Sequence, residues 1–191
     1  MAKFHPSLDL LTEHAAGTLP LAQTACLSAH LNYCEQCRRS VASLQNVGGA
    51  LFGNLSAEPV SENVLDFVLA RLDESAPLSY SAAEAASTGR TPAILQRLMK
   101  GDFSDLSWKK ITDSLRISYL KTGDPNFEFA LYHIKAGGRI PEHKHGGSEM
   151  TLVLQGGFSD SAGSYHEGDF IYREADELHA PTALQSEDCI C

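Results

Sequence analysis

The sequence predicts an α + β protein with two domains, a bundle of three to four helices followed by an antiparallel β-barrel or jelly roll. Three observations lead to this expectation. Apolar residues recur at helical spacing in residues 6–74, they recur with a period near two from about residue 103, and residues 75–91 in between are small and polar. We therefore expect a helical domain over residues 1–75, a linker over 76–102 and a β domain over 103–191.

The helical part divides into three predicted helices. In the first, PSLDLLTEHAAGTL, Pro6 suits the first helical position and Gly17 suits the residue after the end. Residues 21–47 contain no Gly or Pro, which favours one long helix. Residues 59–74 repeat Val or Leu every four residues and predict a third helix, and residues 92–99 predict one more helix or turn within the linker.

The β domain is indicated by four runs that are rich in β-branched and aromatic residues. They are WKKITDSLRISYL, FEFALYHIKA, EMTLVLQGGFSD and GDFIYREA. Short glycine-containing segments separate the runs at roughly ten-residue spacing, which is typical of an all-β sandwich or small barrel.

Composition and charge exclude several classes of partner. The formal net charge is −9, and residues 1–90 carry five Lys and Arg against nine Asp and Glu, while residues 91–191 carry ten against fifteen. Neither half offers the basic surface that phosphate backbones need, so we expect no direct binding of DNA or RNA. No apolar run suits a signal peptide or a membrane span, and we expect a cytoplasmic protein with no membrane partner.

The first candidate metal site is the pattern HxxxCxxC formed by His30, Cys34 and Cys37. On a helix, residues at positions i, i+4 and i+7 share one face, and imidazole together with thiolates suits Zn²⁺. The five cysteines show no disulfide framework, which favours metal binding in a reducing compartment. Two other interpretations stay open: a redox CxxC pair, although no βαβ pattern surrounds it, and helix residues that bind no metal.

A closed structural zinc site needs a fourth ligand. The sequence offers His5, which precedes the first predicted helix, His14 within that helix, and Cys26, which lies four residues before His30. A ligand from His5 would cross-link the first two helices, and a structural metal would stabilise a small module substantially. The residues alone leave all three candidates open.

A second set of candidate ligands lies in the β domain and consists of His143, His145, Glu149 and His179. His143 and His145 share a face if the chain is extended there, because side chains alternate along a strand. A glycine turn would bring Glu149 opposite them, and His179 can complete the set from a later strand. Imidazoles and a carboxylate can hold Zn²⁺ or another divalent transition metal.

The N-terminal pattern H-P…LLxxHAAGTLP…HLxxCxxCRRxV resembles the zinc-binding anti-sigma domain. The resemblance implies a helical bundle with a structural zinc, and a fourth helix, expected within the linker 76–102, that helps to clamp an extracytoplasmic-function sigma factor. It implies His5 as the fourth ligand. His14 falls where the family often has Tyr, and Cys26 is then a small buried helix residue.

Residues 137–156, GGRIPEHKHGGSEMTLVLQG, resemble the first cupin motif, GxxxxxHxHxxxExxxxxxG, at both its ligand and its glycine positions. The second motif is present as Gly163 and Gly168 followed by His179, but the chain has Arg-Glu where a proline is frequent. The resemblance implies a cupin-type β-barrel that binds a metal.

Together, the two patterns resemble the ChrR-type anti-sigma factors over nearly the whole chain. This resemblance implies a protein that binds one extracytoplasmic-function sigma factor, holds it inactive, and releases it on oxidative stress by singlet oxygen or an organic hydroperoxide. It also implies an N-terminal zinc that is needed for sigma binding, a cupin metal (Zn²⁺ or another divalent transition metal) that is needed for the response, and no enzyme activity.

The alternative function is a metal-dependent cupin enzyme, such as a dioxygenase or isomerase, with a zinc-stabilised N-terminal module. A third interpretation is a zinc-stabilised binding protein with a storage or scavenging cupin. No nucleophile motif or Gly-rich phosphate loop indicates a substrate, and an enzyme leaves HxxxCxxC unexplained. Cys189 and Cys191 lie two residues apart, too constrained for an easy disulfide with each other, so they either pack in the barrel or are oxidised singly.

Overall fold

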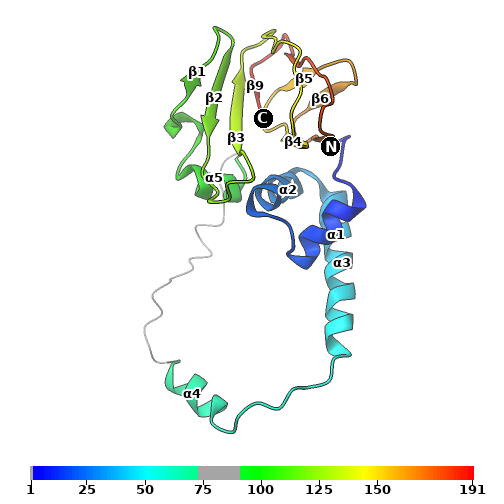
Figure 1. Ribbon diagram of the computed structural model, residues 1–191, viewed down its shortest axis with the longest axis vertical. Coiled ribbons are helices and arrows are strands. Elements are labelled where there is room, and N and C mark those ends of the chain that lie inside the picture. Colours follow the sequence, from blue (N-terminus) through cyan, green and yellow to red (C-terminus); the bar gives the residue numbers. More distant parts are fainter. Residues whose placement is uncertain (1, 73–90) are drawn as a thin grey trace.

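Residues 2–72 and 91–191 are described by the computed structural model, in which the N-terminal helices lie against one side of a β-rich C-terminal domain (Figure 1). The α + β class, with helices first and strands after them, is confirmed. The helices are α1 Leu8–Ala16, α2 Leu21–Tyr33, α3 Glu35–Gly53, α4 Val64–Ala70 and α5 Ala93–Met99, followed by the short 3-10 helix η2 Phe103–Asp105. None of these helices is long and apolar enough to cross a membrane.

Helix α1 begins and ends at residues whose chemistry suits those positions. The Ser7 hydroxyl accepts a hydrogen bond from the Leu10 backbone N–H at 3.3 Å, so Ser7 is the N-cap. Pro6 therefore lies outside the helix, and its predicted place at the first helical position is wrong. Gly17 has φ 71°, the left-handed conformation that glycine adopts without strain, and it ends the helix as predicted.

The long helix predicted over residues 21–47 is broken at Cys34. Cys34 has φ −118° and ψ 103°, an extended conformation that ends α2 and starts α3. Its Sγ accepts a hydrogen bond from the Cys37 backbone N–H at 3.4 Å, so the Cys34 side chain serves as the N-cap of α3. The prediction of one helix is wrong because a capping side chain can end a helix without any Gly or Pro.

The remaining helical predictions differ in extent. Helix α4 covers only the middle of predicted residues 59–74, and residues 73–74 lie outside the described residues, as does the linker from 76 to 90. Helix α5 forms where a helix or turn was expected. Its Leu95 and Met99 are buried in the core that it shares with the β domain.

The described strands pair antiparallel in three sheets, with the orders β1-β2-β3-β9, β4-β7 and β6-β5-β8. Strand β9 pairs with β3, and β8 pairs with β5, so strands from the end of the chain lie beside strands from much earlier in it. This arrangement is consistent with a jelly roll. Each of the four predicted runs contains at least one strand. The strands are β1 Lys109–Lys110, β2 Leu115–Tyr119, β3 Ala130–Ile134, β4 Glu149–Leu152, β5 Gly157–Ser159, β6 Ser164–His166, β7 Phe170–Arg173, β8 Thr182–Ala183 and β9 Cys189–Ile190.

The helices and the β domain share one apolar core. Its buried residues come from α2, from α5 and from the β domain, and are Cys26, Ala29, Leu95, Met99, Leu131, Leu152, Leu154, Phe170 and Ile190. A second cluster fills the β domain, and a third joins α1, α2 and α3. Helix α2 contributes to the first and third clusters, so it links the packing of the helices to the core shared with the β domain.

Candidate metal centres

Four side chains from three segments meet at the N-terminal site. The ligand atoms of His5, His30, Cys34 and Cys37 all lie within 4.8 Å of one another. The nearest contacts are 3.3 Å from His5 Nδ1 to Cys34 Sγ, 3.5 Å from His5 Nδ1 to Cys37 Sγ, and 3.4 Å from His30 Nε2 to Cys37 Sγ. A tetrahedral zinc, with Zn–S of about 2.3 Å and Zn–N of about 2.0 Å, has N···S edges of about 3.5 Å. The group can therefore hold a metal, and its donors and spacing are consistent with zinc.

The other two candidates for the fourth ligand lie elsewhere. Cys26 is buried in the core shared with the β domain, and this burial raises the pKa of its thiol to about 12. His14 lies in α1 and is not part of the group of donors. Of the three, the structure brings only His5 together with HxxxCxxC, from the segment that precedes α1.

The tautomer of His30 is set by the β domain. His30 is completely buried, and its Nδ1 lies 2.8 Å from the carbonyl oxygen of Gly168. Because a carbonyl can only accept a hydrogen bond, Nδ1 carries the proton and Nε2 keeps its lone pair free toward the sulfur of Cys37. Burial lowers the pKa of His30, which keeps the ring in the neutral form that binds metal.

The two cysteines lie at the start of α3, where the helix dipole favours negative charge. Burial nevertheless raises the pKa of the Cys37 thiol to about 12, with a further contribution from its hydrogen bond to Cys34. A cation bound between the two sulfurs would favour the thiolate over the protonated thiol, because the thiolate is the form that binds metal. The site therefore fits a group that brings positive charge.

A second group of donors lies in the β domain. The Nε2 of His179 is 2.9 Å from His143 Nε2 and 3.3 Å from His145 Nε2. The Oε2 of Glu149 is 3.7 Å from the Nε2 atoms of both His145 and His179. This oxygen is buried and has no hydrogen-bond partner among the described residues. Four converging donors, one of them a buried and unpartnered carboxylate oxygen, fit a divalent metal ion.

Backbone pairing positions three of these four donors. Glu149 begins β4, where it is paired with Arg173 of β7. His143 and His179 form an isolated antiparallel bridge, in which each backbone N–H donates to the other's carbonyl at 3.0 Å. Burial lowers the pKa of His179, so its ring stays neutral and its lone pair is available. The sequence-predicted residues are thus all brought to one place.

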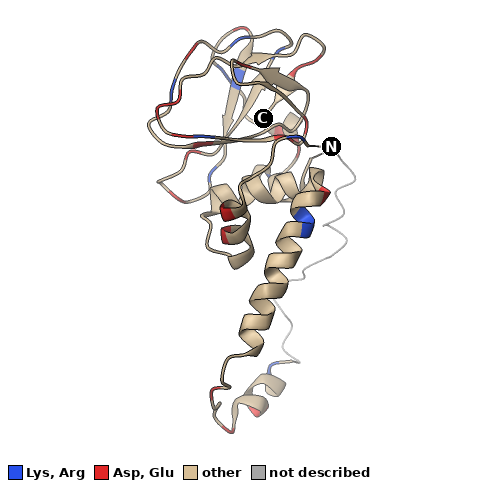
Figure 2. Ribbon diagram, turned by 90° about the vertical axis from the view of Figure 1, so that its right-hand side faces the viewer, with Lys and Arg blue, Asp and Glu red and all other residues tan. Residues whose placement is uncertain are grey.

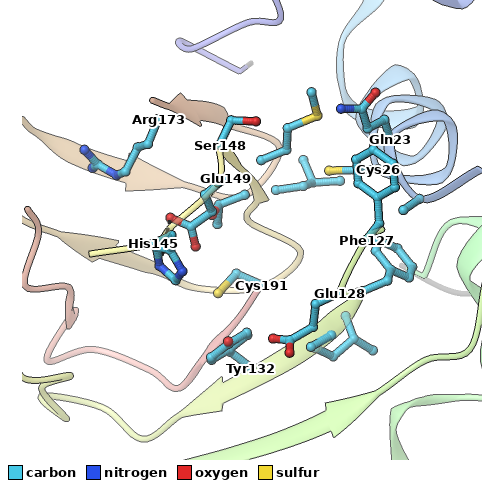
Figure 3. Close-up of a pocket in the computed structure, with 18 of the residues that line it drawn as sticks. Gln23, Cys26, Phe127, Glu128, Tyr132, His145, Ser148, Glu149, Arg173 and Cys191 are labelled. Atoms are coloured by element: carbon cyan, nitrogen blue, oxygen red, sulfur yellow. Dashed lines mark ion pairs between the residues drawn. The ribbon is translucent and has the colours of Figure 1, made fainter. Parts of the chain in front are cut away.

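A cavity of about 540 Å³ lies beside this second group, and the four donors line one end of it. Figure 3 shows Cys191 near Glu149 and His145, with Cys26 of α2 on the opposite side of the cavity. The hydrogen bond to Cys189 and burial raise the pKa of the Cys191 thiol. The volume is in the range of small-molecule sites, and its wall is shared between the β domain and α2.

The structure also brings in residues that the motifs did not indicate. Arg173, in the position where cupins often have proline, is buried and ion-paired with Asp160 and Glu177, so its charge is neutralised beside the donors. Asp160 lies 13 residues before Arg173, and a pair at this separation leaves no local signal in a sequence. For Cys26 the only signal was its spacing from His30, and that spacing pointed to the N-terminal site instead of the cavity.

Helices α3 and α4 expose a large apolar surface. Residues 40–53 contain no charged residue, and this half of α3 projects away from the domains (Figure 2). Phe52 is 76% exposed, and Phe67 of α4 is 63% exposed. Exposed apolar residues in such number indicate an interaction site. We name as the α3–α4 surface the exposed apolar residues of the two helices and of the chain beside them, which are Val47, Leu51, Phe52, Leu55, Val60, Val64, Leu65, Phe67, Val68, Leu69 and Leu72.

Known proteins resemble this chain along its whole length. Residues 96–191 match the family model of the ChrR cupin-like domain. The chain is 34% identical over 189 residues to the anti-sigma-E factor ChrR of Cereibacter sphaeroides, covering 99% of this chain and 87% of that protein. Its structure is similar to ChrR in the complex with Rhodobacter sphaeroides SigE, with a TM-score of 0.87 and 33% identity over 100% of this chain and 97% of that one. An RmlC-like cupin of Ralstonia eutropha jmp134 is also similar, with a TM-score of 0.40 and 26% identity over 47% of this chain and 62% of that one.

Proposed function

Because the chain belongs to the ChrR family of anti-sigma factors, we propose that it binds one extracytoplasmic-function sigma factor, holds it inactive, and releases it when singlet oxygen or an organic hydroperoxide is sensed. The relatives are regulators, one of them in complex with SigE, so the chain is a regulatory protein and not an enzyme. We propose the cytoplasm as its location, because a sigma factor acts there on RNA polymerase.

The α3–α4 surface is the observation that carries this proposal. Apolar side chains exposed to water are stabilised when a partner covers them. Helix α4 lies apart from the rest of the described chain (Figure 1), and its apolar residues are exposed. Helix α5 has already buried Leu95 and Met99 within the molecule. We therefore assign the sigma contact to α3 and α4.

We propose a structural zinc at His5, His30, Cys34 and Cys37. The metal cross-links the segment before α1, the end of α2 and the start of α3, and so fixes the direction in which α3 leaves α2. The α3–α4 surface depends on that direction. The N–S contacts near 3.4 Å and the neutral tautomer of His30 support this role.

We propose a second metal, Zn²⁺ or another divalent transition metal, at His143, His145, Glu149 and His179, with the sensing role. The donor set supports the metal, and the adjoining cavity of about 540 Å³ gives a small oxidant room to approach. Helix α2 forms part of the cavity wall and also carries His30. A change at the second metal can therefore act on the first site through one helix.

The proposed domain limits are residues 1–75 for the zinc-binding helices, 76–102 for the linker and 103–191 for the cupin-like domain. The family model begins at residue 96, within the linker. Helix α5, which the linker contains, packs into the core shared with the cupin-like domain. Its position supports an assignment of α5 as the anchor of the linker on that domain.

A substitution on the α3–α4 surface tests the proposal. In the full chain, Phe67→Glu should weaken binding of the cognate sigma factor by about 30-fold or more, because a buried aromatic anchor typically contributes about 2 kcal/mol or more. Isothermal titration calorimetry with the purified sigma factor measures this. Ile111→Glu is the matched control, since Ile111 is an apolar residue of the β domain that is 46% exposed. Equal weakening by both variants, or by neither, contradicts the assignment.

A further inference from the structure

The turn between β6 and β7 of the cupin-like domain reaches the N-terminal donors at two points. The first is His30, whose Nδ1 donates to the carbonyl oxygen of Gly168 at 2.8 Å. Gly168 has φ 91°, and a Cβ placed on it would lie 2.8 Å from the Cβ of Tyr33. Tyr33 is the last residue of α2, directly before Cys34. Glycine therefore allows the turn to approach the end of α2 closely enough to bond His30.

The second point of contact is the segment that leads into His5. Asp169 is only 2% exposed, and its Oδ1 accepts hydrogen bonds from the backbone N–H groups of Lys3 and Phe4. The other oxygen of this carboxylate accepts the His166 backbone N–H at 2.9 Å. A buried carboxylate with three backbone donors is a strong, charge-assisted anchor.

Phe4 is held by two further contacts with the cupin-like domain. The Phe170 backbone N–H donates to the Phe4 carbonyl at 3.1 Å. The ring of Phe4 packs edge to face on Tyr165, with centroids 4.9 Å apart. His5 is the next residue along the chain, so its reach toward Cys34 and Cys37 is fixed by a segment that is bound to the other domain.

We infer that the Gly168–Asp169 turn is the outer coordination sphere of the N-terminal metal site, and that Asp169 is a positioning residue for His5. The inference rests on the zinc site of the proposed function. Gly168 sets the tautomer of His30, and Asp169 holds the segment that delivers His5. Both histidine ligands of the helical domain are thus oriented by the cupin-like domain.

The test uses Co²⁺ as the probe, because thiolate ligands give Co²⁺ an absorption band that reports the Cys34–Cys37 site separately from the all-His/Glu site. In the full chain, Asp169→Asn should weaken Co²⁺ binding at the thiolate site by about 10- to 100-fold, the usual effect of losing an outer-sphere partner. Asp188→Asn is the matched control. Asp188 also accepts a backbone N–H, from Ala136 at 2.9 Å, but its partners are Ala136 and His133 and no metal ligand.

A second pair of variants tests the same contact from the helical side. Lys3→Pro removes the backbone N–H that Asp169 accepts, whereas Lys3→Ala keeps it. Lys3→Pro should weaken Co²⁺ binding as Asp169→Asn does, and Lys3→Ala should leave it unchanged. Because both changes weaken the same anchor between Asp169 and residues 3–4, their losses should not add in the double variant. If Asp169→Asn does not fold, the comparison of Lys3→Pro with Lys3→Ala tests the inference by itself.

Three results would overturn the inference: Co²⁺ affinity unchanged in folded Asp169→Asn, equal losses in Lys3→Pro and Lys3→Ala, or additive losses in the double variant. Each of them leaves sigma binding by the wild-type chain untouched. A wild-type chain that binds no sigma factor would overturn the proposed function and leave the Co²⁺ comparison valid.

Coupling of this kind is reciprocal, so metal binding should also tighten the domain contact. The backbone N–H of Phe170 donates to the Phe4 carbonyl. Its hydrogen should exchange at least about tenfold more slowly in the metal-loaded chain, if the coupling between metal binding and the domain contact is about 1.4 kcal/mol or more. Equal exchange rates with and without Zn²⁺ would contradict the coupling.

Discussion

At the scale of single residues, Cys37 shows why the N-terminal site depends on a metal. Its thiol is buried, which raises its pKa to about 12, so the sulfur is protonated near neutral pH in the metal-free chain. A metal must displace that proton, because only the thiolate is a ligand. Metal ions and protons therefore compete for this residue.

Zinc uptake at the N-terminal site should release at least one proton per metal at pH 7. The zinc affinity should fall as pH is lowered, by about tenfold per pH unit for each displaced proton, since more protons compete for the sulfur. Calorimetric titrations in two buffers with different ionisation enthalpies measure the proton count. Cys37→Ser is the control and should lose both the site and the proton release. Proton-free uptake by the wild-type chain would contradict this description of Cys37.

The residues of the site were not equally predictable. His30, Cys34 and Cys37 could be predicted because their spacing is local, and the structure brings them together. His5 could not be chosen over His14 and Cys26 from the residues alone. Its position depends on backbone contacts with the β6–β7 turn, which lies far away in the sequence.

At the scale of secondary-structure elements, helix ends decide how the donors are presented. Two ends in this chain have different causes: Gly17 ends α1 by a left-handed backbone, and Cys34 ends α2 by an extended one. The first was predictable from the residue type, whereas the second was not, because cysteine has no strong preference for helix ends. The break at Cys34 lets residues 30 and 37 belong to two helices that meet at one point.

Two glycine substitutions separate these effects on stability. Gly17→Ala should destabilise the zinc-loaded chain by about 1–2 kcal/mol, because its φ of 71° strains any residue with a Cβ. Gly49→Ala is the matched change within α3, where a Cβ would meet no atom within 4 Å, and it should stabilise the chain by about 0.5–1 kcal/mol. Urea unfolding followed by circular dichroism measures both. A Gly17→Ala variant as stable as the wild type would contradict the described end of α1.

At the scale of the whole molecule, the two parts of the chain are joined by a shared core and by the β6–β7 turn. Periodicity indicated which part is helical and which is β, because those patterns are local. It could not indicate that α2 and α5 pack on the cupin-like domain, since that depends on contacts between distant residues. It also predicted an apolar helix near residues 59–74 without showing that its apolar residues are exposed and free for a partner.

In the proposed function, the zinc-bound helices inhibit a sigma factor and the cupin-like domain controls its release. Transcription in vitro from a promoter of the cognate sigma factor tests both parts in one measurement. We predict that one equivalent of zinc-loaded chain stops transcription and that an organic hydroperoxide restores it. His143→Ala should inhibit equally but should not respond to the hydroperoxide. Undiminished transcription with the zinc-loaded wild-type chain, or a normal response of His143→Ala, would contradict the proposed function.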